Sequence, residues 1–373
     1  MAGIYIHIPF CRQKCRYCDF YSVASEGLRI PVLKALRREL ELRRDEIREP
    51  VRTLYFGGGT PTVYSPEEIQ ALIRSVRSFY TVNTFDEITV EANPDDLTDD
   101  YLFRLKNTQV DRLSIGIQSF HDVHLQGFNR RHTAQQAYDA VLRAKVHGFE
   151  NITVDLIYGV PGMTDLEWEQ DLRKFIELDV PHLSAYHLTI EPRTMFGKWA
   201  QQGKITAVSD ETSQRHYEML ERLTTEAGYG HYEISNFARP GMESRHNSSY
   251  WDGTPYLGIG PAAHSFDGRI RRWNTSNNTE YLKGLESGNY FETEHLSDND
   301  RFNEKLMTGL RTAKGVFWEQ LRQEFDPEKI MYLEKAVRKF VRSGLLVDDG
   351  QSIRIPSVYF LLSDSIIADL FRL

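Results

Sequence analysis

Apolar residues follow two alternating periods along the first two thirds of the chain. Short stretches rich in β-branched and aromatic residues predict strands, and each precedes a longer stretch with apolar residues at helical spacing. The predicted strands are residues 3–9, 52–57, 86–94, 111–120, 151–162 and 182–192. The predicted helices are residues 31–47, 67–80, 98–107, 134–147, 165–178 and 210–227. Ser65 and Glu68 have the spacing of a capping box, which marks the start of the second helix.

Six strand–helix alternations favour parallel strands joined by right-handed crossovers. Polar or unusual residues gather at the carboxyl end of each predicted strand, where barrels and doubly wound sheets place their active sites. In chain order they are three cysteines, GGGTPT (57–62), Glu91 and Asn93, Gln118, Asp155, and Tyr186 with His187. This convergence predicts an α/β fold with a partial (β/α)6 barrel over residues 1–230.

The rest of the chain predicts a connection and a smaller domain. We expect residues 231–275 to form a loop region and connection, and residues 276–373 a C-terminal α+β domain. Residues 275–289 indicate a linker with a short helix. Three helical segments within 300–344 and a hairpin around Asp349-Gly350 favour a winged-helix-like module. Such modules often bind DNA, but a cover for the barrel is favoured here because the chain is acidic.

Charge and composition narrow the class of protein. A net charge of −8 and a pI near 5.9 argue against a general nucleic-acid binder. Hydrophobic content of 40% and charged content of 26% are typical of soluble globular proteins, and no apolar run reaches membrane-spanning length. The first residues, MAGIYIHIPFC, enter a predicted strand without the basic region of a signal peptide. We therefore expect a cytoplasmic protein.

The cysteines of the chain, Cys11, Cys15 and Cys18, all stand in the segment CRQKCRYCDF (11–20). Their spacing lets one loop present three thiolates to a 4Fe–4S cluster, whose irons are commonly held by cysteine. Three ligands leave one iron open to a small molecule. Structural zinc would require a fourth Cys or His nearby, and a disulfide would leave one thiol over. An iron–sulfur cluster is the favoured interpretation.

CxxxCxxC with an aromatic residue before its third cysteine resembles the signature of the radical S-adenosylmethionine (radical SAM) superfamily, and Tyr17 stands at that aromatic position. The resemblance implies that the amino and carboxylate groups of S-adenosylmethionine chelate the open iron. It also implies that an electron from the cluster, supplied by an electron donor, can cleave the sulfonium to a 5′-deoxyadenosyl radical.

Further blocks resemble the coproporphyrinogen dehydrogenase-like branch of that superfamily. They are IYIHIPFC, FGGGTPT, TVEANPDD, LSIGIQSF and DLIYGVPG, in that order. The resemblance implies that Tyr5 helps to shape the cluster end. It implies that S-adenosylmethionine contacts Gly58, Gly59, Thr60, Glu91, Gln118, Arg130 and Asp155. From the residues alone, Arg130 in the basic segment FNRRH is as readily a solvated surface charge.

Two families of the branch are separated by three features. The oxygen-independent coproporphyrinogen III dehydrogenase has a further cysteine where this chain has Phe20, and a longer segment before its cysteines. HNSSYW (246–251) instead matches the HNxxYW motif of the heme chaperone HemW family. That resemblance implies heme contact by His246, Asn247, Tyr250 and Trp251, with an imidazole for the iron and aromatic faces for the macrocycle. His264 is a second candidate, and either histidine could instead be satisfied by hydrogen bonds within the protein.

Two hypotheses follow. The favoured one is a chaperone that binds heme and passes it to recipient hemoproteins, with the cluster and S-adenosylmethionine modulating the transfer. The alternative is a dehydrogenase that oxidatively decarboxylates the propionates of coproporphyrinogen III. A radical enzyme acting on RNA would need a basic surface, which the composition does not provide.

Overall fold

Six parallel strands form the central part of the large sheet, and they lie in the predicted order. The computed structural model describes residues 1–372. Each of these strands is hydrogen-bonded to the next one along the chain, and the outer edges of the sheet do not meet. The strands are β1 (Ala2–Ile8), β2 (Val51–Gly58), β3 (Glu87–Ala92), β4 (Arg112–Gln118), β5 (Asn151–Tyr158) and β6 (His182–His187). The predicted α/β class with a partial barrel is confirmed.

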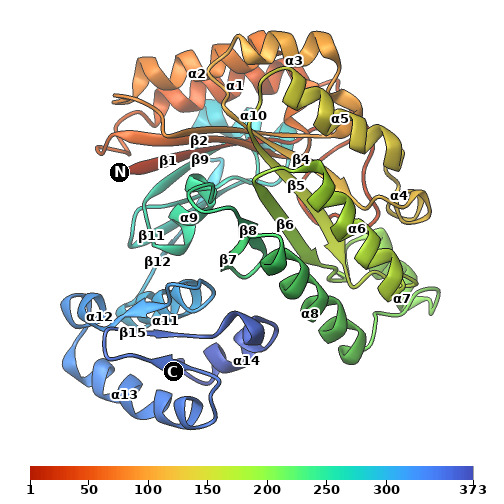
Figure 1. Ribbon diagram of the computed structural model, residues 1–373. Coiled ribbons are helices and arrows are strands. Elements are labelled where there is room, and N and C mark those ends of the chain that lie inside the picture. The colour runs from red at the N-terminus through yellow and green to blue at the C-terminus, as the bar shows by residue number, and fades with distance from the viewer. Residues whose placement is uncertain (373) are drawn as a thin grey trace.

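Helices between the strands cover the outer face of the curved sheet (Figure 1). They are α1 (Arg29–Leu42), α2 (Pro66–Phe79), α3 (Asp99–Lys106), α5 (Ala134–Val146), α6 (Asp165–Leu178) and α8 (Asp210–Glu226). The capping box of Ser65 and Glu68 is present at the start of α2. The first helix ends five residues earlier than expected, because Arg43 leaves the helix and its side chain bonds Glu46 and the carbonyl of Gly258.

Short helical segments that the periodicity did not predict lie near the carboxyl ends of the strands. They are α4 (Asp122–Phe128), α7 (Met195–Gln201) and the 3-10 turns η1 (Pro61–Val63) and η2 (Pro94–Asp96). Each has seven residues or fewer, which is too short to show a helical period in the sequence.

The sheet continues on both sides of the six parallel strands. β7 (Gly230–Glu233) and β8 (Asn236–Ala238) extend the β6 edge, while β9 (Tyr256–Ile259) pairs with β1 in parallel. The antiparallel strands β10 (His264–Phe266), β11 (Ile270–Asn274) and β12 (Phe291–His295) follow on β9. Within residues 1–372 this gives a sheet of twelve strands.

Residues 231–275 are therefore not the expected loop region. They supply most of these added strands and the helix α9 (Arg245–Trp251), which holds the HNSSYW motif. The strands are only three to five residues long, and the edges of β1 and β6 provide their pairing partners. The expected short helix of the linker is present as α10 (Asn278–Ser287).

The C-terminal residues form a small α+β module, shown in blue in Figure 1. Its helices are α11 (Asp298–Gly309), α12 (Trp318–Glu324), α13 (Pro327–Arg342) and α14 (Ser363–Ala368), with the 3-10 segment η3 (Ser357–Leu362) before the last. β14 (Val347–Asp348) and β15 (Ser352–Arg354) form the hairpin predicted around Asp349-Gly350, and β13 (Val316–Phe317) adds a third strand. The winged-helix-like architecture is confirmed.

The expected domain boundaries at 230/231 and 275/276 remain predictions. Since β12 still belongs to the large sheet and α11 starts at Asp298, we propose that the C-terminal module begins near residue 296. None of the helices within residues 1–372 combines the length and the apolar composition needed to cross a membrane.

Candidate functional site

The three cysteines stand on a loop that leaves β1 and is fixed at both ends. The N–H of Cys11 donates to the carbonyl of Val23 (3.0 Å), which closes the loop at its base. The side chain of Asn129 donates to the carbonyl of Lys14 (2.9 Å), and the side chain of Gln13 donates to the carbonyl of Asn129 (2.9 Å). Asn129 ends α4 in a left-handed conformation, φ +64°, so α4 positions the cysteine loop.

The thiols fit a three-cysteine cluster site. All three cysteines are free and partly exposed. Arg130 directs its Nη1 at the sulfur of Cys15 (3.4 Å), and a guanidinium there would offset the negative charge of thiolates. Burial, together with the neighbouring thiols of Cys15 and Cys11, raises the pKa of the Cys18 thiol to about 11. Iron would be needed to deprotonate it at neutral pH.

The glycine segment after β2 packs directly against the cysteine loop. The N–H groups of Gly59 and Thr60 donate to the carbonyls of Ile8 (2.8 Å) and Phe10 (2.7 Å). A Cβ at Gly59 would meet the Ile8 carbonyl oxygen at 2.8 Å, so only glycine allows this approach. The N–H of Gly58 donates to Glu91 (3.1 Å). These three N–H groups thus have hydrogen-bond partners within the protein.

Two half-buried carboxyl groups lie on β3 and β5. Glu91 accepts a hydrogen bond from the Tyr55 hydroxyl (2.8 Å), and burial raises the pKa of Glu91 to about 7. Asp155 accepts from Ser114 (3.1 Å), and burial raises its pKa to about 6. The salt bridges within residues 1–372 do not include either carboxylate. A cationic ligand would therefore be stabilised beside them.

Arg130 is part of this site rather than a solvated surface charge. Its Nη2 donates to the side chain of Asn93 (2.7 Å) and to the Gly116 carbonyl, and Asn93 in turn donates to Thr60 (3.1 Å). Gln118 lies next to this group and has φ +75°, a conformation that costs a non-glycine residue energy and is common at functional sites.

The HNSSYW motif forms the short helix α9, which is held by β3. Ser244 caps the helix by accepting from the Asn247 N–H (3.3 Å). The buried carboxylate of Glu87 accepts from the N–H groups of Arg245 (2.9 Å) and His246 (3.1 Å). A negative charge is favourable at the amino end of a helix, so Glu87 and Ser244 fix where the motif sits.

His246 is fully buried, and both of its ring nitrogens have partners. Nδ1 is 2.8 Å from the Thr53 hydroxyl, Nε2 is 2.8 Å from the Tyr250 hydroxyl, and the ring stacks on Tyr55 at 5.1 Å. Burial lowers the pKa of His246 to about 3, so the ring is neutral. In this arrangement His246 has no free nitrogen for a heme iron.

One cavity of about 1120 Å³ joins the cysteine loop, the motif helix and the C-terminal module. The residues that the sequence singled out and that line this cavity include Tyr5, Cys18, Glu91, Tyr186, His246, Asn247, Tyr250 and Trp251. Its further walls include Tyr256, His264 and Phe266 from the added strands and Arg301, Lys305 and Phe325 from the C-terminal module. Asp155 instead lines a smaller cavity of about 40 Å³ beneath Glu91 and Asn247. His187 lies outside both and its Nε2 is 2.9 Å from Ser213.

Several residues of this site were missed by the sequence analysis. They are Asn129, which holds the cysteine loop, and Tyr256 and Phe266, which form part of the cavity wall. None of them belongs to a recognisable chemical motif, and their roles depend on where α4 and the added strands lie. Of these residues, only Asn129 could have been recognised from the sequence, because an asparagine after a short apolar run often ends a helix in the left-handed conformation.

Two chains named heme chaperone HemW are similar to this one over nearly its whole length. HemW of Lactococcus lactis is 36% identical over 362 residues, which cover 97% of this chain and 95% of that protein. HemW of Bacillus subtilis is 33% identical over 372 residues, which cover 98% of each. This chain belongs to the heme chaperone HemW family.

Profile and structure comparisons agree with this HemW membership. Residues 5–175 match the radical SAM superfamily and residues 296–357 match the HemN C-terminal domain. The coproporphyrinogen III oxidase HemN of Escherichia coli superposes with a TM-score of 0.85 at 24% identity, covering 99% of this chain and 90% of that chain. This likeness shows the fold, a radical SAM barrel with a HemN-like C-terminal domain.

Proposed function

We propose that this protein binds heme in the cavity between the cysteine loop and the C-terminal module and passes it to recipient hemoproteins in the cytoplasm. The observation that carries the proposal is the position of the HNxxYW motif. His246, Asn247, Tyr250 and Trp251 all line a cavity that also reaches Cys18. The names of the HemW relatives support the same activity.

The motif residues have distinct tasks in this proposal. Tyr250 and Trp251 offer aromatic surface to the flat macrocycle. His246 holds the Tyr250 hydroxyl from behind, and Glu87 holds the helix on β3. The basic residues Arg301 and Lys305 of α11 lie in the same cavity, where they favour the negative charge of heme propionates.

The cysteine loop would hold a 4Fe–4S cluster through Cys11, Cys15 and Cys18, with S-adenosylmethionine beside it. When bound, the cluster can exchange an electron with S-adenosylmethionine, which would require an electron donor as a partner. Glu91 and Asp155 would attract the positive charge of S-adenosylmethionine, and Arg130 and Asn93 would orient its acceptor groups. Tyr5, Gly58, Gly59, Thr60 and Gln118 would complete the pocket around it.

Transfer of heme is the decisive test. Anaerobically reconstituted protein is loaded with one equivalent of hemin, passed through a desalting column and mixed with an apo-peroxidase, whose activity is then followed. We expect peroxidase activity to appear in proportion to the heme delivered, and Trp251→Ala to reduce the heme retained after desalting. The control Phe103→Ala removes an exposed aromatic side chain that does not line the cavity.

Failure of the wild-type protein to retain hemin would contradict the proposal. Decarboxylation of coproporphyrinogen III in the presence of S-adenosylmethionine and a reductant would instead support the dehydrogenase alternative. Phe20, which stands where the dehydrogenase has a further cysteine, argues against that outcome.

A further inference from the structure

Three histidines line the large cavity, and they differ in the state of their ring nitrogens. His7 has Nδ1 at 3.1 Å from the Tyr5 hydroxyl and Nε2 at 2.9 Å from the Tyr21 carbonyl. His246 likewise has a partner for each nitrogen. His264 is exposed to the cavity, and neither of its nitrogens has a hydrogen-bond partner among residues 1–372. An imidazole must have a free nitrogen to bind a metal, and of the three only His264 has one.

The strand register directs His264 toward the cavity. Side chains alternate between the two faces of a strand, so His264 and Phe266 share one face of β10 and Ser265 lies on the other. Phe266 pairs with Tyr256 of β9 and Arg271 of β11, and all three line the cavity. The imidazole therefore stands on a platform that also provides two aromatic rings and a guanidinium.

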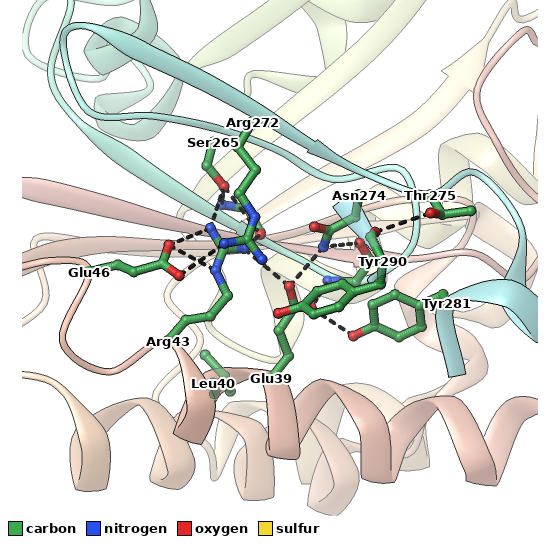
Figure 2. A network of polar contacts seen from close by, with 12 residues as sticks. Glu39, Leu40, Arg43, Glu46, Ser265, Arg272, Asn274, Thr275, Tyr281 and Tyr290 are labelled. Carbon is green, nitrogen blue, oxygen red and sulfur yellow. Dashed lines mark hydrogen bonds and ion pairs between the residues drawn. The ribbon is translucent and has the colours of Figure 1, made fainter. Parts of the chain in front are cut away.

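The opposite face of the same strands is fixed by a buried polar network (Figure 2). Arg43 of α1 donates to the Ser265 hydroxyl (3.0 Å) and to the Gly258 carbonyl (2.7 Å). Glu39 accepts from Asn274 (2.8 Å) and from Tyr281 (2.6 Å). This network holds the backbone on both sides of His264 against α1, so the imidazole is presented from a rigid strand.

The backbone of His264 on β10 also lies unusually close to the backbone of Gly258 on β9. A Cβ at Gly258 would collide with the carbonyl oxygen of His264, so glycine at 258 permits the two strands to approach. The side chain of His264 packs against Trp273, with ring centroids 6.2 Å apart and planes inclined by 28°. The position of the ring is thus defined before a ligand arrives.

We propose that His264 is the axial ligand that this protein gives to the heme iron, and that His246, on the buried side of α9, is a positioning residue for Tyr250. The inference rests on the proposed function, since it names the residue that holds the iron of that cargo. The rings of Tyr250 and Tyr256 contact each other, with centroids 4.6 Å apart. The macrocycle then lies against the shared aromatic surface of Tyr256, Phe266, Tyr250 and Trp251.

Hemin titration of the full-length, reconstituted protein tests the assignment. The Soret band and the electron paramagnetic resonance spectrum of ferric heme are recorded for wild type, His264→Ala and His264→Gln. We expect both variants to lose the imidazole signature and to bind hemin at least tenfold more weakly. Added imidazole is expected to restore the signature in His264→Ala. The matched control is His295→Ala, which removes an exposed histidine of β12 outside the cavity and leaves the spectrum unchanged.

The outcomes separate the inference from the proposed function. Wild-type binding with unchanged spectra in both His264 variants overturns the assignment of His264 and leaves the heme-binding function standing. Loss of the imidazole signature in a folded His246→Ala protein, with His264→Ala unaffected, overturns it in favour of His246. A wild type that binds no hemin overturns both.

Discussion

At the residue scale, buried groups at this site are either satisfied within the protein or positioned for a ligand. His246 belongs to the first kind, because Thr53 and Tyr250 occupy its nitrogens. Glu91 belongs to the second, because a hydroxyl and one N–H partly offset the cost of burying its charge and no basic side chain pairs with it among residues 1–372. Substitutions at the two residues should therefore affect different properties.

Removing the His246 ring is expected to cost stability. In His246→Ala the hydroxyls of Thr53 and Tyr250 lose buried partners and the stacked face of Tyr55 is left uncovered. We expect the free energy of unfolding to fall by about 2–4 kcal/mol. Urea denaturation followed by circular dichroism measures it. His295→Ala, at an exposed position, is expected to change it by less than about 0.5 kcal/mol. A loss in His246→Ala no larger than this would mean that the ring is not held as described.

The affinity for S-adenosylmethionine should depend on pH through Glu91. Burial raises the pKa of Glu91 to about 7, so below pH 7 the carboxyl is mostly neutral and above it negative. A cationic ligand favours the negative form, and affinity therefore rises with pH. Between pH 6 and pH 8 we expect Glu91 to contribute a gain of about tenfold, measured by equilibrium dialysis of reconstituted protein.

A glutamine at position 91 cannot ionise, so the affinity of Glu91→Gln for S-adenosylmethionine should be lower and should depend much less on pH over that range. Asp155, whose pKa burial raises to about 6, would leave a smaller dependence of about twofold. An equally steep pH profile in wild type and Glu91→Gln would show that another group controls binding.

At the element scale, the sequence predicted the elements whose signals are local. β1 to β6 and the long helices between them follow from alternating and helical apolar patterns, and Ser65 with Glu68 marks a helix start. Glu91 and Asp155 were expected near each other because parallel strands end at one edge of a sheet. They line the same small cavity.

Other features could not be predicted, because distant residues determine them. HNSSYW contains weak helix formers and was expected in a loop, but Glu87 on β3 caps α9 from more than 150 residues away in the sequence. The pairing of β9 with β1 joins distant segments in the same way. The burial of His246 depends on Thr53, which no motif connects to it.

The cap of α9 can be removed to test whether distant residues, rather than local helix propensity, hold the HNSSYW motif in a helix. Ser244→Ala removes the hydroxyl that accepts from the Asn247 N–H, and we expect a loss of about 0.5–2 kcal/mol in the free energy of unfolding. Retention of hemin should weaken as well, because the helix carries Tyr250 and Trp251. The matched control is Ser248→Ala in the same helix, whose hydroxyl has no partner among residues 1–372. Equal losses in the two variants would argue that the cap does not fix α9.

At the scale of the whole molecule, the cavity is assembled from parts that are distant in the sequence. The C-terminal module joins the barrel through hydrogen bonds from the Ala313 N–H to the Tyr232 carbonyl (3.0 Å) and from the Ile234 N–H to the Arg311 carbonyl (2.9 Å). Arg271 of β11 also pairs with Glu304 of α11 (2.7 Å) across the cavity wall. Cys18 of the cysteine loop and His264 of β10 line this shared space from different elements.

Heme binding should therefore survive loss of the cluster. The variant with Cys11, Cys15 and Cys18 all replaced by Ser cannot hold iron–sulfur and has no thiol that could bind hemin instead. We expect it to bind about one hemin per chain with the imidazole signature of the wild type, measured by Soret titration. Delivery to the apo-peroxidase should change if the cluster modulates the transfer of heme, as the chaperone hypothesis holds. Absence of hemin binding in a folded triple variant would place the heme at the cluster end.

The position of β1 within the sheet has a consequence for synthesis of the chain. β1 pairs on one side with β2 and on the other with β9, which begins only at Tyr256. On a ribosome that adds about 5–20 residues a second, roughly 12–50 seconds separate the emergence of β1 from that of β9. Until then one edge of an apolar strand lacks its partner, and such edges favour pairing with other chains. The nascent protein is therefore most exposed to misassembly at the strand that leads into its cysteine loop.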